Sequence, residues 1–436
     1  MQLNPLLLVY LLPLLAIWLI WTLLARRRSQ RHLAVLKDNI QAGLDQPASL
    51  HPVIDPARCL GCASCAHACP EKTVLGIIDG KAALVEPALC VGHGACAAAC
   101  PTGAISLVFG TATRGVDIPL LTPEFETSVP GLFIAGELGG MGLIKNAIEQ
   151  GRQAIAAIAA RTRKIQGGEG VLDVVIVGCG PAGIAASLGA MERGLSFVTV
   201  DQSTLGGTVA HFPRGKLVMT APAVLPLIGE VRFGEISKER LLSFWQDVLE
   251  KTGLQPRFEE EVTAVRRSGS HFEVATGRGV YRSKLVLLAI GRRGTPRTLG
   301  VPGEDLGKVV YRMIDPQQYA GRRVLVVGGG DSALEAAARI AEQPGAEVTL
   351  SYRGSAYNRA RRKNREDVAA AVAEGRIKEL LGSEVLLIEE QQVSLSHANR
   401  TLQIANDDVI ICAGGILPAA LLNEAGVEVE TKFGVA

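Results

Sequence analysis

The sequence predicts an α/β protein with two doubly wound parallel sheets, a small α+β domain and one N-terminal transmembrane helix. Three observations predict this fold class. Two apolar strands each lead into a glycine-rich loop and a helix, seven of the nine cysteines lie between Cys59 and Cys100, and the first apolar segment is uncharged. With 436 residues, the chain has room for roughly three domains of about 150 residues each.

The composition argues against several function classes. Lys and Arg number 45 against 43 Asp and Glu, so overall charge does not favour a nucleic-acid-binding protein. The 49 glycines and 4% aromatic residues fit an α/β protein with glycine-rich turns better than an aromatic-rich β-sandwich. The cysteines have the spacing of metal ligands rather than of a secreted disulfide framework, which indicates a reducing compartment.

The N-terminal segment has the pattern of a membrane anchor. Residues 6–24 carry no charge and would form a helix of roughly 28 Å, which matches a hydrocarbon core. A cleaved signal peptide is the alternative, but arginines at 26–28 stand where a small-residue cleavage site would be. Because cations beside a span stay cytoplasmic, we expect a single-pass anchor in the inner (cytoplasmic) membrane, with the later domains facing the cytoplasm.

The cysteines form two runs of related spacing. The first run consists of Cys59, Cys62, Cys65 and Cys69, followed by Pro70. The second run consists of Cys90, His93, Cys96 and Cys100, followed by Pro101, with histidine in place of the second cysteine. A zinc site is the alternative, but runs of the form C-x2-C-x2-C-x3-C-P are typical of iron–sulfur proteins.

Residues 57 to about 108 resemble the two-cluster bacterial ferredoxin module, which implies two 4Fe-4S clusters. The resemblance assigns cluster I to Cys59, Cys62, Cys65 and Cys100. It assigns cluster II to Cys69, Cys90 and Cys96, with His93 as the expected fourth ligand. The alternative is a 3Fe-4S cluster II with His93 only nearby. An imidazole ligand would raise the reduction potential, because it replaces an anionic thiolate.

The first glycine loop follows the apolar strand at 174–177, and a helical pattern follows the loop. Its glycines are Gly178, Gly180 and Gly183, and the next strand ends at Asp201. Glycines at this spacing let a pyrophosphate approach the backbone, and an acid in this place can accept from a ribose 2′-hydroxyl. The pattern therefore predicts a dinucleotide site, in which Cys179 is interpreted as a packing residue.

The second glycine loop follows the apolar strand at 324–327. Its residues are Gly328, Gly330, Asp331 and Ser332. No acid follows the next strand, which leads instead into Arg353, Arg359 and a basic run at 361–363. Because a 2′-phosphate needs cations where a 2′-hydroxyl needs a carboxylate, we expect NADPH rather than NADH. A solvated basic helix face is the alternative interpretation.

Two such sites in one chain resemble the thioredoxin-reductase-like flavoprotein reductases and their bacillithiol-disulfide-reductase-like relatives. In that branch the first loop holds FAD and the second holds NADPH. A turn that contacts the flavin ribityl chain normally lies at the C-terminus, but here it is found at 127–137, before the first loop, and includes Gly136 and Glu137. The chain therefore resembles a circularly permuted member, over residues 111–436, with Glu137 where the family usually has Asp.

The redox cysteine pair of these reductases is missing. After Cys100, the only cysteines are Cys179 and Cys412, so no C-x-x-C pair can form. The bacillithiol branch does not use such a pair, so the absence weakens a thiol-reducing activity without excluding it.

The expected organisation has five parts. They are a transmembrane anchor (1–28), a juxtamembrane helix and linker (29–56), a ferredoxin-like two-cluster domain (57–110), an FAD-binding domain (111–312, with 111–165 as the permuted part) and an NAD(P)H-binding domain (313–436). Both nucleotide domains are expected to be Rossmann-like.

The expected function is that of a membrane-anchored NAD(P)H-dependent flavoprotein oxidoreductase. It would pass electrons between NADPH, FAD and two iron–sulfur clusters, to or from a partner redox protein such as a cytochrome, a quinone-reactive protein or a ferredoxin. No side chain is expected to be catalytic, because the flavin and clusters carry the chemistry. The alternatives are a low-molecular-weight disulfide reductase and a non-catalytic electron-wiring subunit of a membrane complex. No nucleic-acid partner is expected, and a homodimer stays open.

Overall fold

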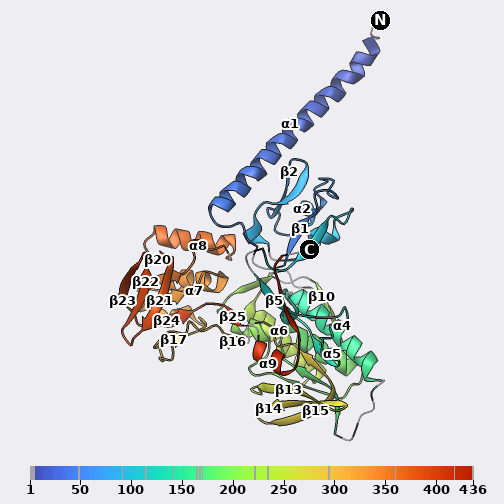
Figure 1. Ribbon diagram of the computed structural model, residues 1–436, viewed down its shortest axis with the longest axis vertical. Coiled ribbons are helices and arrows are strands. Elements are labelled where there is room, and N and C mark those ends of the chain that lie inside the picture. The colour runs from blue at the N-terminus through green and yellow to red at the C-terminus, as the bar shows by residue number, and fades with distance from the viewer. Residues whose placement is uncertain are drawn as a thin grey trace. The chain divides into compact units, whose positions relative to one another are not determined.

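The computed structural model describes most of the chain. The described residues are 5–47, 50–90, 92–112, 115–140, 142–163, 165, 168, 170–219, 222–232, 235–292, 295–358, 360–416 and 418–434. The chain divides into two compact units (Figure 1), which are residues 1–115 with 355–365 and 432–436, and residues 116–354 with 366–431. Arg359, expected near the adenosine phosphate, lies outside the described residues.

The first unit begins with one long helix, α1 (Pro5–Gln41). The sequence predicts an anchor and then a separate juxtamembrane helix. The two are continuous, because no glycine or proline lies between Pro13 and Gln41 to end the helix.

A membrane-spanning helix is not supported. In the part of the chain that the structure describes, no helix is both long and apolar enough to cross a membrane.

The rest of the first unit is mainly a small α+β domain around the two cysteine runs. Its strands are β1 (His51–Ile54), β2 (Leu75–Ile78), β3 (Lys81–Leu84) and β4 (Ile105–Val108), and its short helices are α2 (Ser64–Ala68), η1 (Pro87–Leu89) and α3 (Ala95–Ala98). β1 pairs with β4, and β2 pairs with β3, both antiparallel. Cys65 and Cys96 lie in its core with Val74, Leu75 and Ile105, so two predicted ligands are also packing residues.

The second unit contains two larger sheets. The first has the order β13–β14–β15–β7–β8, with β6 also paired to β15. Its strands are β6 (Leu132–Ile134), β7 (Leu172–Val177), β8 (Phe197–Val200), β13 (Val262–Ser268), β14 (His271–Thr276) and β15 (Gly279–Leu288). Its helices are α4 (Ile144–Thr162), α5 (Pro181–Glu192) and α6 (Lys238–Thr252). Strands β6, β15, β7 and β8 run parallel, as in a doubly wound dinucleotide-binding domain.

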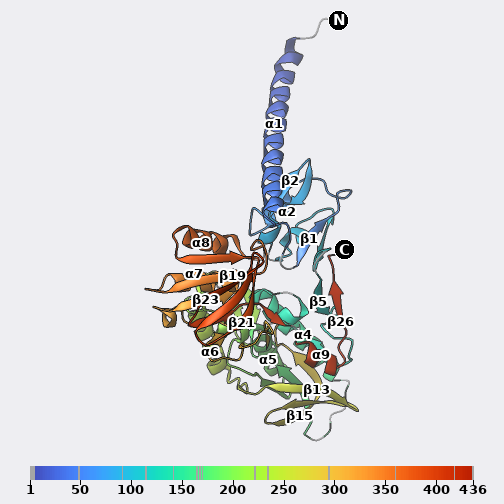
Figure 2. The same ribbon diagram turned by 60° about the vertical axis from the view of Figure 1, so that its left-hand side comes forward.

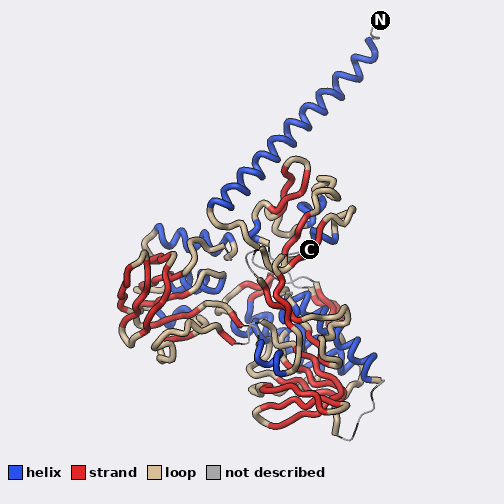
Figure 3. Tube along the Cα trace, in the orientation of Figure 1, coloured by secondary structure: helices blue, strands red, loops and turns tan. Residues whose placement is uncertain are grey.

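β6 and α4 precede the first glycine loop in the sequence, yet they complete this first sheet. Leu132 and Ile134 of β6 pair with Val286 and Leu288 of β15. Helix α4 packs against α5, and Ile155 of α4 is fully buried in the shared core. Figure 3 shows helices flanking the strands of this unit. This is the arrangement that a circular permutation predicts.

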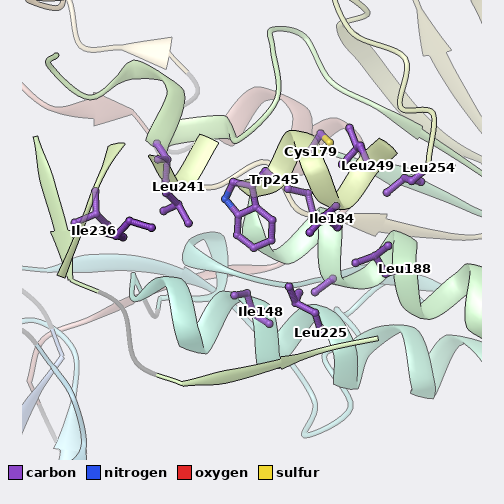
Figure 4. Close-up of a cluster of buried hydrophobic side chains, with 14 residues drawn as sticks. Ile148, Cys179, Ile184, Leu188, Leu225, Ile236, Leu241, Trp245, Leu249 and Leu254 are labelled. Atoms are coloured by element: carbon purple, nitrogen blue, oxygen red, sulfur yellow. The ribbon is translucent and has the colours of Figure 1, made fainter. Parts of the chain in front are cut away.

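A second core lies where α4, α5 and α6 meet the short elements between β8 and α6. These elements are η3 (Gly207–His211), β9 (Leu217–Met219), β10 (Ala223–Leu225), β11 (Gly229–Val231) and β12 (Glu235–Ser237). Trp245 of α6 lies among Ile148, Ile184 and Leu241 (Figure 4). The packing joins the helix that follows the first loop to the permuted helix α4.

The second sheet has the order β17–β24–β18–β19–β20, all parallel. Its strands are β17 (Val309–Val310), β18 (Arg323–Val327), β19 (Glu347–Tyr352), β20 (Ile377–Leu381) and β24 (Asp408–Ile411). Its helices are η4 (Pro316–Tyr319), α7 (Asp331–Ala341) and α8 (Arg362–Ala373), and an antiparallel meander is formed by β21 (Ser383–Ile388), β22 (Gln392–His397) and β23 (Arg400–Ala405). Two segments connect this domain to the first one. They form the short strands β16 (Thr295–Pro296) and β25 (Gly415–Ile416), which pair antiparallel with each other.

The chain returns to the first dinucleotide-binding domain near its end. Helix α9 (Ala419–Glu424) contributes Leu422 to the core of that domain, and β26 (Val429–Lys432) pairs with β5 (Val116–Pro119), as Figure 2 shows. The sequence assigned all of 313–436 to the second domain. It gave no sign of the return, because one short helix and one strand fit either domain equally well in pattern.

Candidate cofactor sites

Four of the predicted ligands line one cavity of the α+β domain. They are Cys59, Cys62, Cys65 and Cys100. Two runs contribute, because Cys100 follows α3 of the second run while the other three come from the first. The structure therefore groups the side chains that the ferredoxin resemblance assigns to cluster I.

The sulfur atoms of this cavity receive hydrogen bonds. The Cys59 Sγ accepts from the backbone N–H groups of Gly61 and Ala82, each at 3.4 Å, and the Cys100 Sγ accepts from Ala104 N–H at 3.2 Å. The Ser64 hydroxyl lowers the pKa of Cys62, and the Thr102 hydroxyl lowers the pKa of Cys100. These contacts favour the thiolate, which is the form that binds metal.

The other four predicted ligands line a second cavity. They are Cys69, Cys90, His93 and Cys96. Burial raises the pKa of Cys90 to about 11 and also raises the pKa of Cys69 and of Cys96. Burial also raises the pKa of Cys65 in the first cavity, but hydrogen bonds lower the pKa of Cys62 and of Cys100 there. The second cavity therefore opposes negative charge more, and a neutral imidazole suits it electrostatically.

His93 occupies the same kind of turn as Cys62. Cys62 stands between Gly61 (φ 68°) and Ala63 (φ 62°), just before α2. His93 stands between Gly92 (φ 77°) and Gly94 (φ 75°), just before α3. The repeated left-handed turn places the imidazole where the related run places a thiol, and His93 lines the cavity.

Two further polar residues line the second cavity, and sequence reasoning missed both. His51 of β1 is buried there, and Glu71 follows Cys69 and Pro70. The cysteine spacing gives no signal for His51, because β1 reaches the cavity only through its antiparallel pairing with β4. The second cavity thus has two imidazoles on its wall.

The donor sets fit iron–sulfur clusters. Among the described residues, no group of three or more His, Cys, Asp or Glu side chains converges on a position for a single metal ion. In a cluster, each thiolate binds a different iron, so ligands spread around a cavity are what it requires. The N–H donors to sulfur are a second feature of such sites.

The first glycine loop has the close approaches that its spacing predicts. Gly178 has φ 107°, and a Cβ there would lie 2.5 Å from the Ala289 carbonyl oxygen. A Cβ on Gly183 would lie 1.8 Å from the Gly178 carbonyl oxygen, so this glycine lets α5 pack on the strand end. Gly180 has only Gly206 and Gly207 near its missing Cβ, at 3.8 Å or more, which leaves its backbone open to a ligand.

Asp201 follows β8 and is buried beside this loop. Its Oδ2 accepts from Cys179 N–H at 2.6 Å, and its Oδ1 accepts from Ser203 N–H at 2.8 Å. The carboxylate therefore holds the loop in shape. Each oxygen keeps a second lone pair, so a ribose hydroxyl can still donate to it, and that contact stays a prediction.

The permuted turn lies against the same loop. Gly136 has φ 89°, its N–H donates to Gln150 Oε1 at 2.8 Å, and a Cβ there would lie 3.1 Å from the Ala182 Cβ. Glu137 begins the short helix η2 (Glu137–Gly139). The structure thus brings Gly136 and Glu137 to the site of Gly178, Gly180 and Gly183, although some forty residues separate them.

Sequence reasoning missed other residues at this site. Gly207 packs on Gly180, where a Cβ would lie 3.1 Å from the Gly180 Cα, and both Gly206 and Gly207 have positive φ. Arg292 donates to the Asp117 carbonyl oxygen at 2.7 Å, and burial lowers the pKa of Arg292 while nearby Glu137 opposes that shift. The adjacent glycines after Asp201 were the available signal.

The second loop has a similar geometry. Gly328 has φ 145°, and a Cβ there would lie 2.5 Å from the Cys412 carbonyl oxygen. Gly330 caps α7 with open space around its missing Cβ, and Asp331 and Ser332 form the first turn of that helix. A helix N-terminus beside an open glycine suits a pyrophosphate.

Arg353 directly follows β19 and is exposed. In this fold, the end of the strand after the glycine loop is where the adenosine ribose lies. The Tyr352 ring packs on the second glycine loop, because a Cβ on Gly329 would lie 2.4 Å from carbon atoms of that ring. Arg353 therefore lies where the sequence predicts a phosphate contact.

The two remaining cysteines have no partner cysteine in sequence and differ in setting. Cys179 is fully buried in the core of Figure 4, and burial raises the pKa of its thiol. Burial raises the pKa of Cys412 to about 12. Both thiols are held in the neutral form, which is a poor nucleophile, and Cys179 is a packing residue.

Comparisons with known proteins agree with this geometry. The family described as "Pyridine nucleotide-disulphide oxidoreductase" matches residues 175–434, and the "4Fe-4S dicluster domain" matches residues 51–101. Bacilliredoxin reductase Bdr of Bacillus subtilis (strain 168) is 26% identical over 267 residues, which are 60% of this chain and 82% of that protein. A ferredoxin–NADP reductase of Ignicoccus hospitalis is 29% identical over 201 residues, which are 46% of this chain and 62% of that protein.

A solved structure shares the fold. The bacillithiol disulfide reductase Bdr from Staphylococcus aureus has a TM-score of 0.53 and 24% identity, and the match covers 58% of this chain and 80% of that one. The resemblance to thioredoxin-reductase-like flavoproteins and to a ferredoxin module is thereby confirmed. Because the first family matches more than half of the 436 residues, the chain belongs to the pyridine nucleotide-disulphide oxidoreductase family and carries a 4Fe-4S dicluster domain N-terminal to it.

Proposed function

We propose that this chain passes electrons between NADPH and a partner redox protein, with FAD and two 4Fe-4S clusters as its cofactors. The observation that carries the proposal is the division of eight predicted ligands between two cavities of one domain. FAD, when bound, couples a two-electron hydride donor to carriers that accept single electrons. A flavoprotein without such carriers would not need the ferredoxin domain.

In this scheme, the residues of the chain bind and orient the cofactors. Gly178, Gly180 and Gly183 admit the FAD pyrophosphate to the backbone, and Asp201 fixes their loop. Gly328 and Gly330 do the same for NADPH. The cysteines and His93 hold the clusters, with hydrogen bonds to sulfur in the first cavity and burial in the second.

The proposal includes association with the inner membrane through α1, with the domains facing the cytoplasm. It is supported by the exposed apolar side chains between Leu12 and Leu24, which include Ile17, Trp18 and Trp21. Water would meet these side chains in the isolated protein, whereas a bilayer would cover them. The arginines at 26–28 suit an anionic membrane surface on the cytoplasmic side.

A disulfide reductase is the competing function, because a relative is named bacilliredoxin reductase. The raised pKa of the Cys179 and Cys412 thiols does not favour it, because a neutral thiol is a poor nucleophile. The experiment is to add NADPH anaerobically to the full chain reconstituted with FAD and iron–sulfide. We expect the flavin absorbance to bleach first and cluster signals to appear next by electron paramagnetic resonance.

Dithionite is the control, because it reduces the clusters whether or not the flavin communicates with them. Clusters that dithionite reduces but NADPH does not, in a protein whose flavin NADPH reduces, would support the disulfide reductase instead. A protein that takes up no flavin would contradict both functions.

The nucleotide preference is expected to depend on Arg353. A charge-assisted contact to phosphate contributes about 1.5 to 3 kcal/mol, so Arg353→Ala should weaken NADPH by roughly tenfold or more and change NADH little. Rates of flavin reduction at varied NADPH and NADH concentrations measure the effect on each nucleotide. Arg339→Ala is the matched control, since Arg339 is exposed at the far end of α7. Equal use of both nucleotides by the unmutated protein would mean that the basic residues form a solvated face.

A further inference from the structure

The second half of α1 is part of the ferredoxin domain. Asp79 N–H donates to Ser29 Oγ at 3.0 Å, and Ile77 N–H donates to His32 Nδ1 at 3.0 Å. Asn39 Nδ2 donates to the Val85 carbonyl oxygen at 3.3 Å. Figures 1 and 2 both show the β2–β3 hairpin beside α1. The helix that carries the exposed apolar segment is thus fixed to the domain that carries the cysteines.

These three contacts give the hairpin a direction along α1. The turn of the hairpin, at Asp79, lies beside Ser29, whereas Val85, past its open end, lies beside Asn39. Ser29 and Asn39 are separated by roughly 15 Å of helix, and Ser29 is only roughly 7.5 Å beyond Leu24, the last apolar residue of the exposed segment. The turn therefore points toward the apolar end of α1.

The cavity lined by Cys59 lies at the end of the β2–β3 hairpin that carries the turn. A Cβ on Gly61 would lie 2.0 Å from the Gly80 carbonyl oxygen, so the two turns are in close contact. Lys81 Nζ donates to the Cys59 carbonyl oxygen at 2.7 Å, and Ala82 N–H donates to the Cys59 Sγ at 3.4 Å.

The cavity lined by Cys69 lies at the open end of the same hairpin. Val74 and Leu75 line it, and Val85 N–H donates to the Val74 carbonyl oxygen at 2.8 Å. The two cavities are therefore ordered along α1, and that of Cys59 is nearer the exposed apolar segment.

The edge of this nearer cavity is apolar and basic. Leu60, at 74%, is the most exposed large apolar side chain of the described residues, and Cys62 beside it is exposed. Arg58 and Lys81, both exposed, flank the edge. Two exposed acids lie near these residues in the chain: Asp79 accepts from the Ser29 hydroxyl at 3.3 Å, on the side of α1, and Asp55 accepts from Ala57 N–H at 2.8 Å. A partner that docks here needs an apolar contact surrounded by carboxylates.

We propose that this edge, formed by Arg58, Leu60, Cys62 and Lys81, is the docking surface for an acidic one-electron carrier protein held in the same membrane. The inference rests on the proposed function. It adds that the cluster in the cavity of Cys59 is the one that faces the partner. In the direction of NADPH oxidation, one NADPH becomes NADP⁺ and a proton, and two carrier molecules each gain one electron.

The order of the cavities can be measured without turnover. The full chain, loaded with clusters, is placed in vesicles of phosphatidylethanolamine and phosphatidylglycerol that carry a dysprosium chelate on the lipid headgroup. We expect dysprosium to speed the spin relaxation of one reduced cluster more than the other, and His93→Cys identifies the signal of the Cys69 cavity. Faster relaxation of the signal that His93→Cys leaves unchanged supports the inference. Equal or reversed enhancement overturns it.

Flotation of the same vesicles separates this inference from the proposed function. Protein that does not float would overturn membrane association and the inference together. Protein that floats with the reversed order of relaxation would overturn the inference alone, and failure of NADPH to reduce the clusters in detergent would overturn the proposed function.

The partner class is tested by photocrosslinking in native membranes, with p-benzoylphenylalanine in place of Leu60. The matched control replaces Val53, an exposed apolar residue of β1 in the same domain. We expect an adduct with an integral membrane haem or iron–sulfur protein from position 60, lost at high salt and weaker from position 53. A soluble ferredoxin as the sole adduct, or equal yields from both positions, would overturn the docking surface.

Discussion

Gly151→Ala is expected to cost the protein most of its FAD. In an unconstrained helix, this change stabilises by about 1 kcal/mol. Here the sign reverses, because a Cβ on Gly151 of α4 would lie 2.1 Å from the carbonyl oxygen of Ala182 in the first turn of α5. Overpacking of this kind costs roughly 1–3 kcal/mol or more, and the displaced atoms belong to the glycine loop itself. Flavin content after purification and the thermal midpoint measure the effect.

Gly277→Ala is the matched control, since nothing lies within 4 Å of its missing Cβ and its φ is ordinary. That variant should keep its flavin and its thermal midpoint. If Gly151→Ala did the same, α4 would not pack on α5, and the permuted segment would not belong to the FAD site.

The glycine positions show why much of the nucleotide sites was predictable. The roles of Gly178 and Gly183 follow from local geometry, since strand, turn and helix meet within a few residues and only one residue type avoids the clash. The ligand sets follow in the same way, because the spacing within each run and the shared turn around Cys62 and His93 determine which side chains converge.

Other features depend on contacts that local patterns do not encode. The boundary placed at residues 28 and 29 followed charge, but charge does not end a helix, and the contacts of His32 with the hairpin extend α1 into the ferredoxin domain. Leu422 reaches the first domain only because the chain returns there after β25. His51 reaches its cavity through strand pairing, which a single sequence does not reveal.

His93→Ala is expected to have the largest effect on the clusters. It leaves Cys69, Cys90 and Cys96 as the predicted ligands of the second cavity, so one of four irons should be lost and a three-iron signal should appear. His51→Ala is the matched control, because it removes the other imidazole of the same cavity. Iron analysis and electron paramagnetic resonance of anaerobically prepared protein distinguish the two variants. Iron loss in His51→Ala but not in His93→Ala would make His51 the ligand.

His93→Cys should keep four irons and lower the reduction potential of cluster II, on the order of 100 mV, because a thiolate adds a negative charge that the imidazole lacks. The unmutated cluster II should therefore lie above cluster I in potential and hold the electron longer. A three-iron signal as the sole cluster II species in unmutated protein would rule out ligation by His93, and the two-cluster relay would then contain a three-iron member.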